Sequence, residues 1–154
     1  MYLKELTSYK SKVLSFLCSS DEIYQLLKLD GDTESTCGVD LSYKQIYPYS
    51  YIPNTNVEKS VFIAFDVDIP RVRTGNIYKD VGVHLYLLCH KDLMKTVRGT
   101  RIDVLGNIID QDLDRNDDYG FKLYLVSAKH FMASEEYYGL ELYYEAVDWN
   151  STRR

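Results

Sequence analysis

The stretch from Val81 to Cys89 constrains the fold of this chain more than any other part of the sequence. Its odd positions are all apolar, so a strand here has one continuous hydrophobic face. Its even positions, Gly82, His84, Tyr86 and Leu88, are mixed rather than charged. A strand with one apolar and one partly apolar face is typical of the middle of a sheet. We therefore expect a central strand at this point.

A helix is expected soon after this strand, from Arg98 to Asp114. Its apolar residues recur at helical spacing, and Gly106 lowers helix stability by about 1 kcal/mol relative to Ala, so close packing is favoured there. We predict that two apolar rows meet in the core, with Val83, Leu85 and Leu87 against Ile102, Leu105 and Ile109.

Two helices are expected before the strands. The first is amphipathic, about five turns long, with Leu6, Val13 and Leu17 on its apolar side. The second is short: Ser or Asp within residues 19–21 can cap it, and it should end near Asp30-Gly31, where Gly accepts a left-handed conformation.

Three further strands are expected from alternating patterns. One runs from Lys59 to Ile69 and is stopped by Pro70, which cannot donate a ladder hydrogen bond. Another covers Phe121 to Ala128. The last, Leu140 to Ala146, has the clearest one-sided alternation, which favours an edge position, and Trp149 can pin its end.

The resulting order is α-β-β-α-β-β. It predicts an α+β fold with a four-stranded, mostly antiparallel sheet and helices packed on one face. A length of 154 residues fits a single domain, 1–154, that is large enough to bury a real core.

A long segment at about 31–57 has no sustained period and is rich in tyrosine. It carries four of the 15 tyrosines of the chain, Tyr43, Tyr47, Tyr49 and Tyr51. A loop of this length is unusual inside a compact domain, which favours a segment that binds a partner. A surface loop packed on its own aromatic residues is the alternative, and strand propensity alone is another reason for many tyrosines.

Charge and cysteine content exclude several classes. The net charge of −5 argues against a general nucleic-acid binder, which usually carries a basic stripe. Three cysteines without a CxxC pair fit a reducing compartment. The N-terminus has no signal-peptide pattern, and no apolar run is long enough for a membrane span.

The Cys89-His90-x-Asp92 cluster is the one candidate for thiol or metal chemistry. A zinc site needs more ligands at defined spacing, and the only other histidines are His84 and His130. We expect instead a core cysteine at a strand end beside a solvated histidine.

Two weaker motifs are rejected. Asp112-x-Asp114-x-Asn116 resembles the start of an EF-hand loop, but Asp117 and Leu123 stand where Gly and Glu are required. Gly99-Thr100-Arg101 lacks the lysine and glycine spacing of a phosphate loop, and helix capping by Thr100 is the better interpretation. No catalytic, cofactor or metal residue is therefore predicted, and we expect no enzyme activity.

The layout nevertheless suggests a family. A helix and a hairpin are followed by the segment Asp80 to Asp92, then a helix beginning Gly99-Thr100-Arg101, then a second hairpin; Tyr51-Ile52-Pro53-Asn54 precedes the first strand. From Tyr47 to Asn150 this layout resembles the tail terminator, or tail completion, proteins of the neck of long-tailed bacteriophages.

The resemblance implies a virion protein, assembled in the host cytoplasm, that forms a ring, typically a hexamer. The ring would end the tail tube, dock the head connector and let DNA pass without specific binding, with no membrane involved. Head-completion and other neck adaptor proteins are close alternatives. A small cytoplasmic enzyme or regulatory protein that uses Cys89, His90 and Asp92 is the alternative from another class. The predicted interface residues are Tyr43, Tyr47, Tyr49, Tyr51, Arg71, Arg73, Asp112, Asp114, Asp117 and Tyr143.

Overall fold

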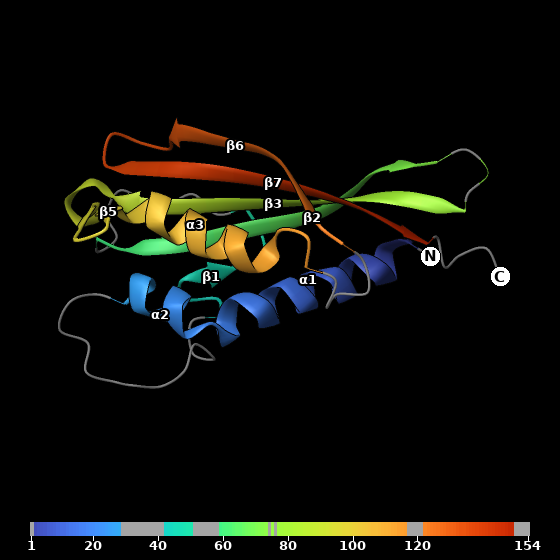
Figure 1. Cartoon of the computed structure of the whole chain (residues 1–154), viewed down its shortest axis with the longest axis horizontal. Helices are drawn as coiled ribbons and strands as arrows, with labels where there is room; N and C mark the ends of the chain where they lie inside the picture. Colours follow the sequence, from blue (N-terminus) through green and yellow to red (C-terminus); the bar gives the residue numbers. More distant parts are fainter. Residues whose placement is uncertain are drawn as a thin grey trace.

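The computed structural model describes residues 2–28, 42–50, 59–73, 75, 77–116 and 122–149. Figure 1 shows helices gathered along one side of a twisted sheet. The elements in chain order are α1 (Tyr2–Ser19), α2 (Asp21–Leu27), β1 (Ile46–Tyr47), β2 (Val61–Val72), β3 (Tyr78–His90), a 3₁₀ turn (Lys91–Leu93), β4 (Lys95–Thr96), β5 (Gly99–Thr100), α3 (Arg101–Leu113), β6 (Tyr124–Met132) and β7 (Tyr137–Trp149).

The main sheet has five strands in the order β1-β2-β3-β7-β6, so the expected four-stranded sheet is wrong. The additional strand is β1, which comes from the tyrosine-rich segment and pairs parallel to β2 through Ile46 opposite Ile63. The other neighbours are antiparallel, which makes the sheet mixed. β4 and β5 form a separate two-stranded sheet. The expected order of six elements missed all three of these short strands.

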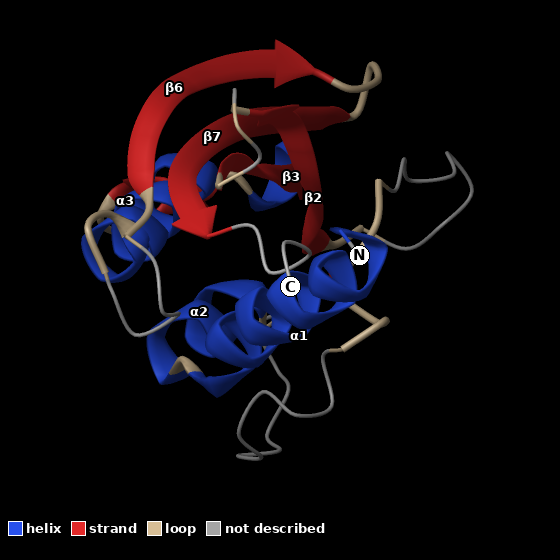
Figure 2. Ribbon diagram, turned by 90° about the vertical axis from the view of Figure 1, so that its right-hand side faces the viewer, coloured by secondary structure: helices blue, strands red, loops and turns tan. Residues whose placement is uncertain are grey.

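β3 is the central strand, as its sequence predicted, but β7 is not an edge. β7 lies between β3 and β6, and β6 is the edge strand on that side (Figure 2). The alternation of β7 arises because its residues from Leu140 to Ala146 point one side chain into the core and the next to the opposite face. Such alternation shows that one face of the strand is solvated. A strand between two others can also have a solvated face, so alternation alone does not identify an edge strand.

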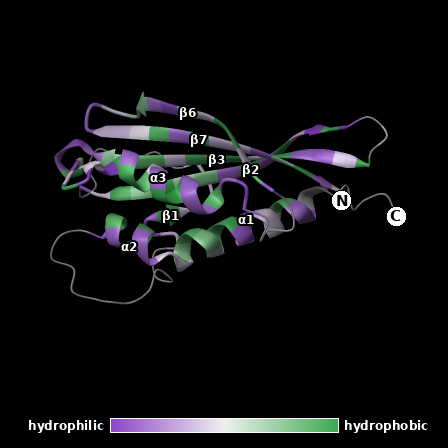
Figure 3. Ribbon diagram, viewed as in Figure 1, coloured by the Kyte–Doolittle hydropathy of each residue, from purple (hydrophilic) through white to green (hydrophobic). Residues whose placement is uncertain are grey.

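The core lies between the helices and one face of the sheet. Both predicted rows are buried in a single cluster: Val83, Leu85, Leu87, Ile102, Leu105 and Ile109. α1 and α2 add Val13, Leu17, Ile23 and Leu27 to this cluster. Each helix carries both hydrophobic and hydrophilic residues (Figure 3), consistent with one face toward the sheet.

Gly106 lets α3 approach β7 closely, because a Cβ there would come within 2.7 Å of Leu140 Cδ2.

The N-terminal ends of α2 and α3 are capped differently. Ser20 caps α2 by accepting a hydrogen bond from the backbone N–H of Ile23, at 3.4 Å. Thr100 occupies the cap position of α3, but its side chain makes no capping hydrogen bond, so the expected capping by its hydroxyl is wrong.

β2 does not stop before Pro70. It continues to Val72 after a shift of register between Asp68 and Arg71. An irregularity in an edge region accommodates a proline that lacks a ladder donor. β2 and β3 therefore extend together beyond the helices (Figure 1).

Candidate assembly surfaces

Cys89 and His90 occupy opposite faces of β3 and do not form a catalytic pair. The thiol of Cys89 is buried in the core and donates to the backbone carbonyl of His90, at 3.3 Å. Burial raises the pKa of Cys89 to about 12, and nearby Arg101 offsets only part of this effect. The thiol is therefore protonated at neutral pH, and no imidazole is placed to remove its proton.

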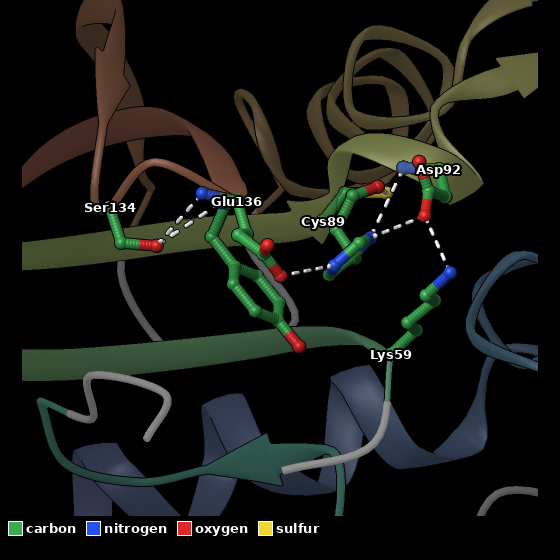
Figure 4. A network of polar contacts seen from close by, with 7 residues as sticks. Lys59, Cys89, Asp92, Ser134 and Glu136 are labelled. Carbon is green, nitrogen blue, oxygen red and sulfur yellow. Dashed lines mark hydrogen bonds and ion pairs between the residues drawn. The ribbon is translucent and has the colours of Figure 1, made fainter. Parts of the chain in front are cut away.

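His90 is buried rather than solvated, which corrects the expectation from the sequence. Its Nδ1 accepts a hydrogen bond from the backbone N–H of Asp92, at 3.1 Å, and its Nε2 lies 3.0 Å from Glu136 Oε2. Asp92 in turn forms an ion pair with Lys59, at 2.6 Å (Figure 4). Both ring nitrogens are occupied, so this network ties the end of β3 to the β6–β7 turn and to the start of β2.

The carboxylates of this network are held ionised by their partners. The hydrogen bond with His90 lowers the pKa of Glu136, and the hydrogen bond from Lys59 lowers that of Asp92. Within the described residues no group of three His, Cys, Asp or Glu side chains could hold a metal ion.

Two of the acids at the end of α3 are used inside the fold. Asp110 accepts a hydrogen bond from the Tyr144 hydroxyl, at 2.7 Å, and Asp114 accepts one from the backbone N–H of Leu125, at 2.9 Å. Burial, followed by the bond to Asp110, raises the pKa of Tyr144. Asp112 is exposed on α3, and Asp117 lies outside the described residues.

The structure brings three of the predicted tyrosines together. Tyr47 and Tyr49 have ring centroids 5.7 Å apart, and Tyr43 and Tyr49 6.4 Å apart. Tyr47 also packs edge-on against Phe62 of β2, at 6.0 Å. This cluster covers the β1 side of the sheet. Tyr51 lies outside the described residues, as does most of the segment 31–57.

Tyr143 lies on the face of the sheet opposite the main core. Its ring stacks on His84 with centroids 4.4 Å apart, and its hydroxyl donates to Glu145, at 2.7 Å. Burial is the main cause of its raised pKa, and the bond to Glu145 adds to it. Asp68 lies 3.3 Å from the same imidazole, so this face combines aromatic rings with carboxylates.

The predicted residues Arg71 and Arg73 belong to a region that we call the arm. It consists of the projecting end of the β2–β3 hairpin (residues 69–73 and 77–80) and the end of β7 that pairs with it (residues 147–149). Both guanidinium groups bind the carboxylate of Asp80, each at 2.9 Å. Burial alone would raise the pKa of Asp80, but the two arginines hold it below its usual value. The arginines are thus fixed to the arm rather than free in solvent.

One apolar surface, the arm patch, consists of Ile77, Tyr78, Val147 and Trp149. All four side chains are exposed, Trp149 at 65%. Tyr78 and Trp149 are register partners on β3 and β7, with ring centroids 4.7 Å apart. The sequence predicted only that Trp149 anchors the end of its own strand. The strand pairing that places it beside Tyr78 could not be read from the pattern.

The base of the arm is pinned to α1 by two polar contacts. The Tyr9 hydroxyl donates to Asp148, and the buried ammonium of Lys79 pairs with Glu5. Lys79 also lies 5.5 Å from the centroid of the Tyr9 ring. The arm is therefore attached to the body of the domain in one defined position.

A second apolar surface, the β6 patch, consists of Tyr124, Leu125, Val126 and Met132 of the edge strand, with Tyr138 of β7 opposite Met132. All are exposed, including Val126 at 54% and Met132 at 65%. Successive residues of a strand point to opposite faces, so β6 exposes apolar side chains on both. Within the described residues, β6 pairs only with β7. The sequence pattern predicted neither β6 as the edge strand nor the exposure of these residues.

On the opposite side of the sheet β1 covers only the start of β2, and other contacts protect the outer edge of β2. The backbone N–H of Ile63 donates to the carbonyl of Gln45, at 2.7 Å, and that of Val67 donates to the Asp66 side chain, at 2.9 Å. Pro70 follows without a donor. Natural sheets use such devices to prevent pairing with another chain, and they are concentrated here on β2.

Fold and surfaces together define a small α+β domain with a projecting arm and an edge strand, β6, that pairs with no strand other than β7 among the described residues. The YomW family model matches residues 13–146, and the chain belongs to this family. YomW is a phage-derived family, so this is a phage-related protein. No curated protein and no solved structure matches the chain. In the part of the chain that the structure describes, no helix has the length and hydropathy to cross a membrane.

Proposed function

We propose that this chain is a structural virion protein of a tailed bacteriophage, a tail terminator that forms a ring at the head–tail junction. The ring caps the tail tube and docks the head connector. The observation that carries the proposal is the β6 patch, since a long strand edge with apolar side chains on both faces is suited to adding a neighbouring chain. The phage-derived family supports the same class of protein.

The charge of the chain suits a passage for DNA. A net charge of −5 repels phosphate, so DNA passes through such a ring without being bound specifically. Asp112 is an exposed acid at the C-terminal end of α3 and is available to line this passage. Asp110 and Asp114 are less available for this role, because both accept hydrogen bonds from other parts of the domain.

The burial of Cys89 argues against the alternative that this chain is an enzyme. A nucleophilic cysteine needs an electropositive, accessible setting that stabilises the thiolate. Cys89 is buried with a raised pKa, and the ring nitrogens of His90 are directed to Asp92 and Glu136. The virion proposal is therefore preferred.

Cryo-electron microscopy of the phage particle tests the proposal. We expect ring density that fits this fold between the last tail-tube ring and the head connector. A copy located on the head side of that position would make the chain a head-completion or neck adaptor protein instead. A particle without the chain would refute a structural role in the virion.

A further inference from the structure

We infer that the arm patch of one copy docks on the β6 patch of the next copy. This inference rests on the proposed function, because it assigns the two surfaces that hold the ring together. The arm patch lies at the start of β3 and the end of β7, and the β6 patch lies on β6 and the start of β7, so they are different surfaces of one chain. Contact between unlike surfaces is head-to-tail, and when it closes on itself it gives a cyclic ring.

A single type of contact then covers both exposed surfaces in every copy. Isolated exposed apolar residues are ordinary, but gathered patches mark interaction sites. Trp149 and Tyr78 supply the large aromatic area that dominates the energy of many interfaces. Leu125, Val126 and Met132 offer aliphatic side chains for these rings to contact.

Two simpler ways of covering β6 are disfavoured. Pairing β6 with β2 of the next copy would continue the sheet, but β2 is closed by Gln45, Asp66 and Pro70. Pairing β6 with β6 about a two-fold axis at Lys129 would place the two copies of Lys129 directly opposite each other, and like charges in that position are destabilising. The arm is the remaining projecting element with apolar side chains.

The charges of the two surfaces are compatible. The arm carries three cationic side chains, Arg71, Arg73 and Lys79, against two carboxylates, Asp80 and Asp148. Glu145 and Glu141 lie on β7 opposite Tyr124 and Lys129 of β6. The arm therefore carries a positive excess, and carboxylates lie beside the strand that it contacts, an arrangement that favours this orientation of the two copies.

The arm is also prepared for binding. Lys79 with Glu5, and Tyr9 with Asp148, hold its base against α1. A surface fixed in its bound position loses less conformational entropy when it docks.

The test uses the full chain and sedimentation velocity over a concentration series. The arm variant is Tyr78→Lys, and the β6 variant is Val126→Lys. Val97→Lys is the matched control, because Val97 is exposed and belongs to neither patch. Circular dichroism confirms that each variant is folded. Trp149 is the only tryptophan, so its emission reports burial of the arm patch directly.

We expect the wild type and the Val97→Lys control to assemble, with a blue shift of the Trp149 emission. Each patch variant should weaken assembly by about tenfold or more. An equal mixture of the two patch variants should form dimers, because a wild-type arm patch then meets a wild-type β6 patch, while each variant alone cannot form that contact.

Assembly of either patch variant with wild-type affinity would overturn the inference, as would a mixture that forms no dimers. A wild-type chain that stays monomeric throughout the series would also overturn it. These results are separable from failure of the proposed function. A chain found at the head–tail junction whose patch variants still assemble refutes only the docking surfaces, whereas a chain absent from the particle refutes the virion role itself.

Discussion

Lys79 of β3 is fully buried, and its ammonium group pairs with the carboxylate of Glu5 in the first turn of α1. The two residues are 74 positions apart in the chain. A buried ion pair is weak proof of net stability, because desolvation of both groups offsets their attraction. Loss of one partner is costly, however, because the other charge is left buried without compensation.

We predict that Glu5→Gln lowers the free energy of unfolding by about 2–4 kcal/mol, since it leaves the Lys79 ammonium without its counter-charge. Lys79→Met should cost less, because it removes the buried charge and keeps an unbranched side chain of similar length. Urea denaturation of both variants provides the measurement. Equal losses in the two variants would contradict a role for the uncompensated charge.

A second prediction concerns the contact between β3 and α3. Leu85 is completely buried in the cluster that contains Leu105 and Ile109. Leu85→Ala should lower the free energy of unfolding by about 2–5 kcal/mol, because it removes apolar contacts and leaves a cavity. Leu125→Ala is the control, since Leu125 is exposed on β6 and should lose far less. An unchanged denaturation midpoint for Leu85→Ala would refute this packing.

Cys89 provides a third prediction. In a chain with Cys18→Ser and Cys37→Ser, Cys89 is the only remaining thiol. Its burial and its pKa of about 12 should keep it unreactive toward a thiol reagent until the protein unfolds. Mass spectrometry after timed labelling, with and without urea, measures this directly. Labelling of the folded protein as fast as that of the unfolded chain would restore Cys89 as a candidate nucleophile.

The elements with long periods were predictable from the sequence. α1, β3 and α3 each repeat apolar residues over many positions, so the hydrophobic effect selects one buried face for each. The rows led by Leu85 and Leu105 therefore meet as expected. The glycine at position 106 also had the predicted role, since it allows close contact with Leu140.

The short strands and the strand order were not predictable in this way. β1 is two residues long, so it has no period to detect, and its position depends on pairing with Ile63 far along the chain. The edge was assigned to Leu140–Ala146 because alternation reports a solvated face, but it does not report the number of neighbouring strands. β6 became the edge through pairings that only the folded chain shows.

The same limit applies to the candidate surfaces. The sequence predicts Arg71 and Arg73 as interface residues, but their shared partner Asp80 depends on the register of β2 against β3. His90 was expected to be solvated because its partner Glu136 is 46 positions away. Local sequence gives residue types and faces, whereas burial of a polar group depends on partners that arrive from elsewhere.

The last prediction concerns the acid sensitivity of the arm. Burial opposes ionisation of Asp80, but hydrogen bonds from Arg71 and Arg73 prevail and hold its pKa below the usual 3.8. A carboxyl group whose pKa is lower in the folded than in the unfolded state stabilises the fold fully above the unfolded-state value. That stabilisation is lost as the pH falls through the folded-state pKa.

The wild type should therefore be more stable than Asp80→Asn at neutral pH, and the difference should shrink below about pH 4. A double-mutant cycle with Arg71→Met isolates the contribution of the pair, and its coupling energy should decrease over the same range. Chemical denaturation from pH 6 to pH 2, at about 0.1 M salt to limit screening, gives both quantities. A coupling energy that stays constant down to pH 2 would show that the arginines do not depend on the charge of Asp80.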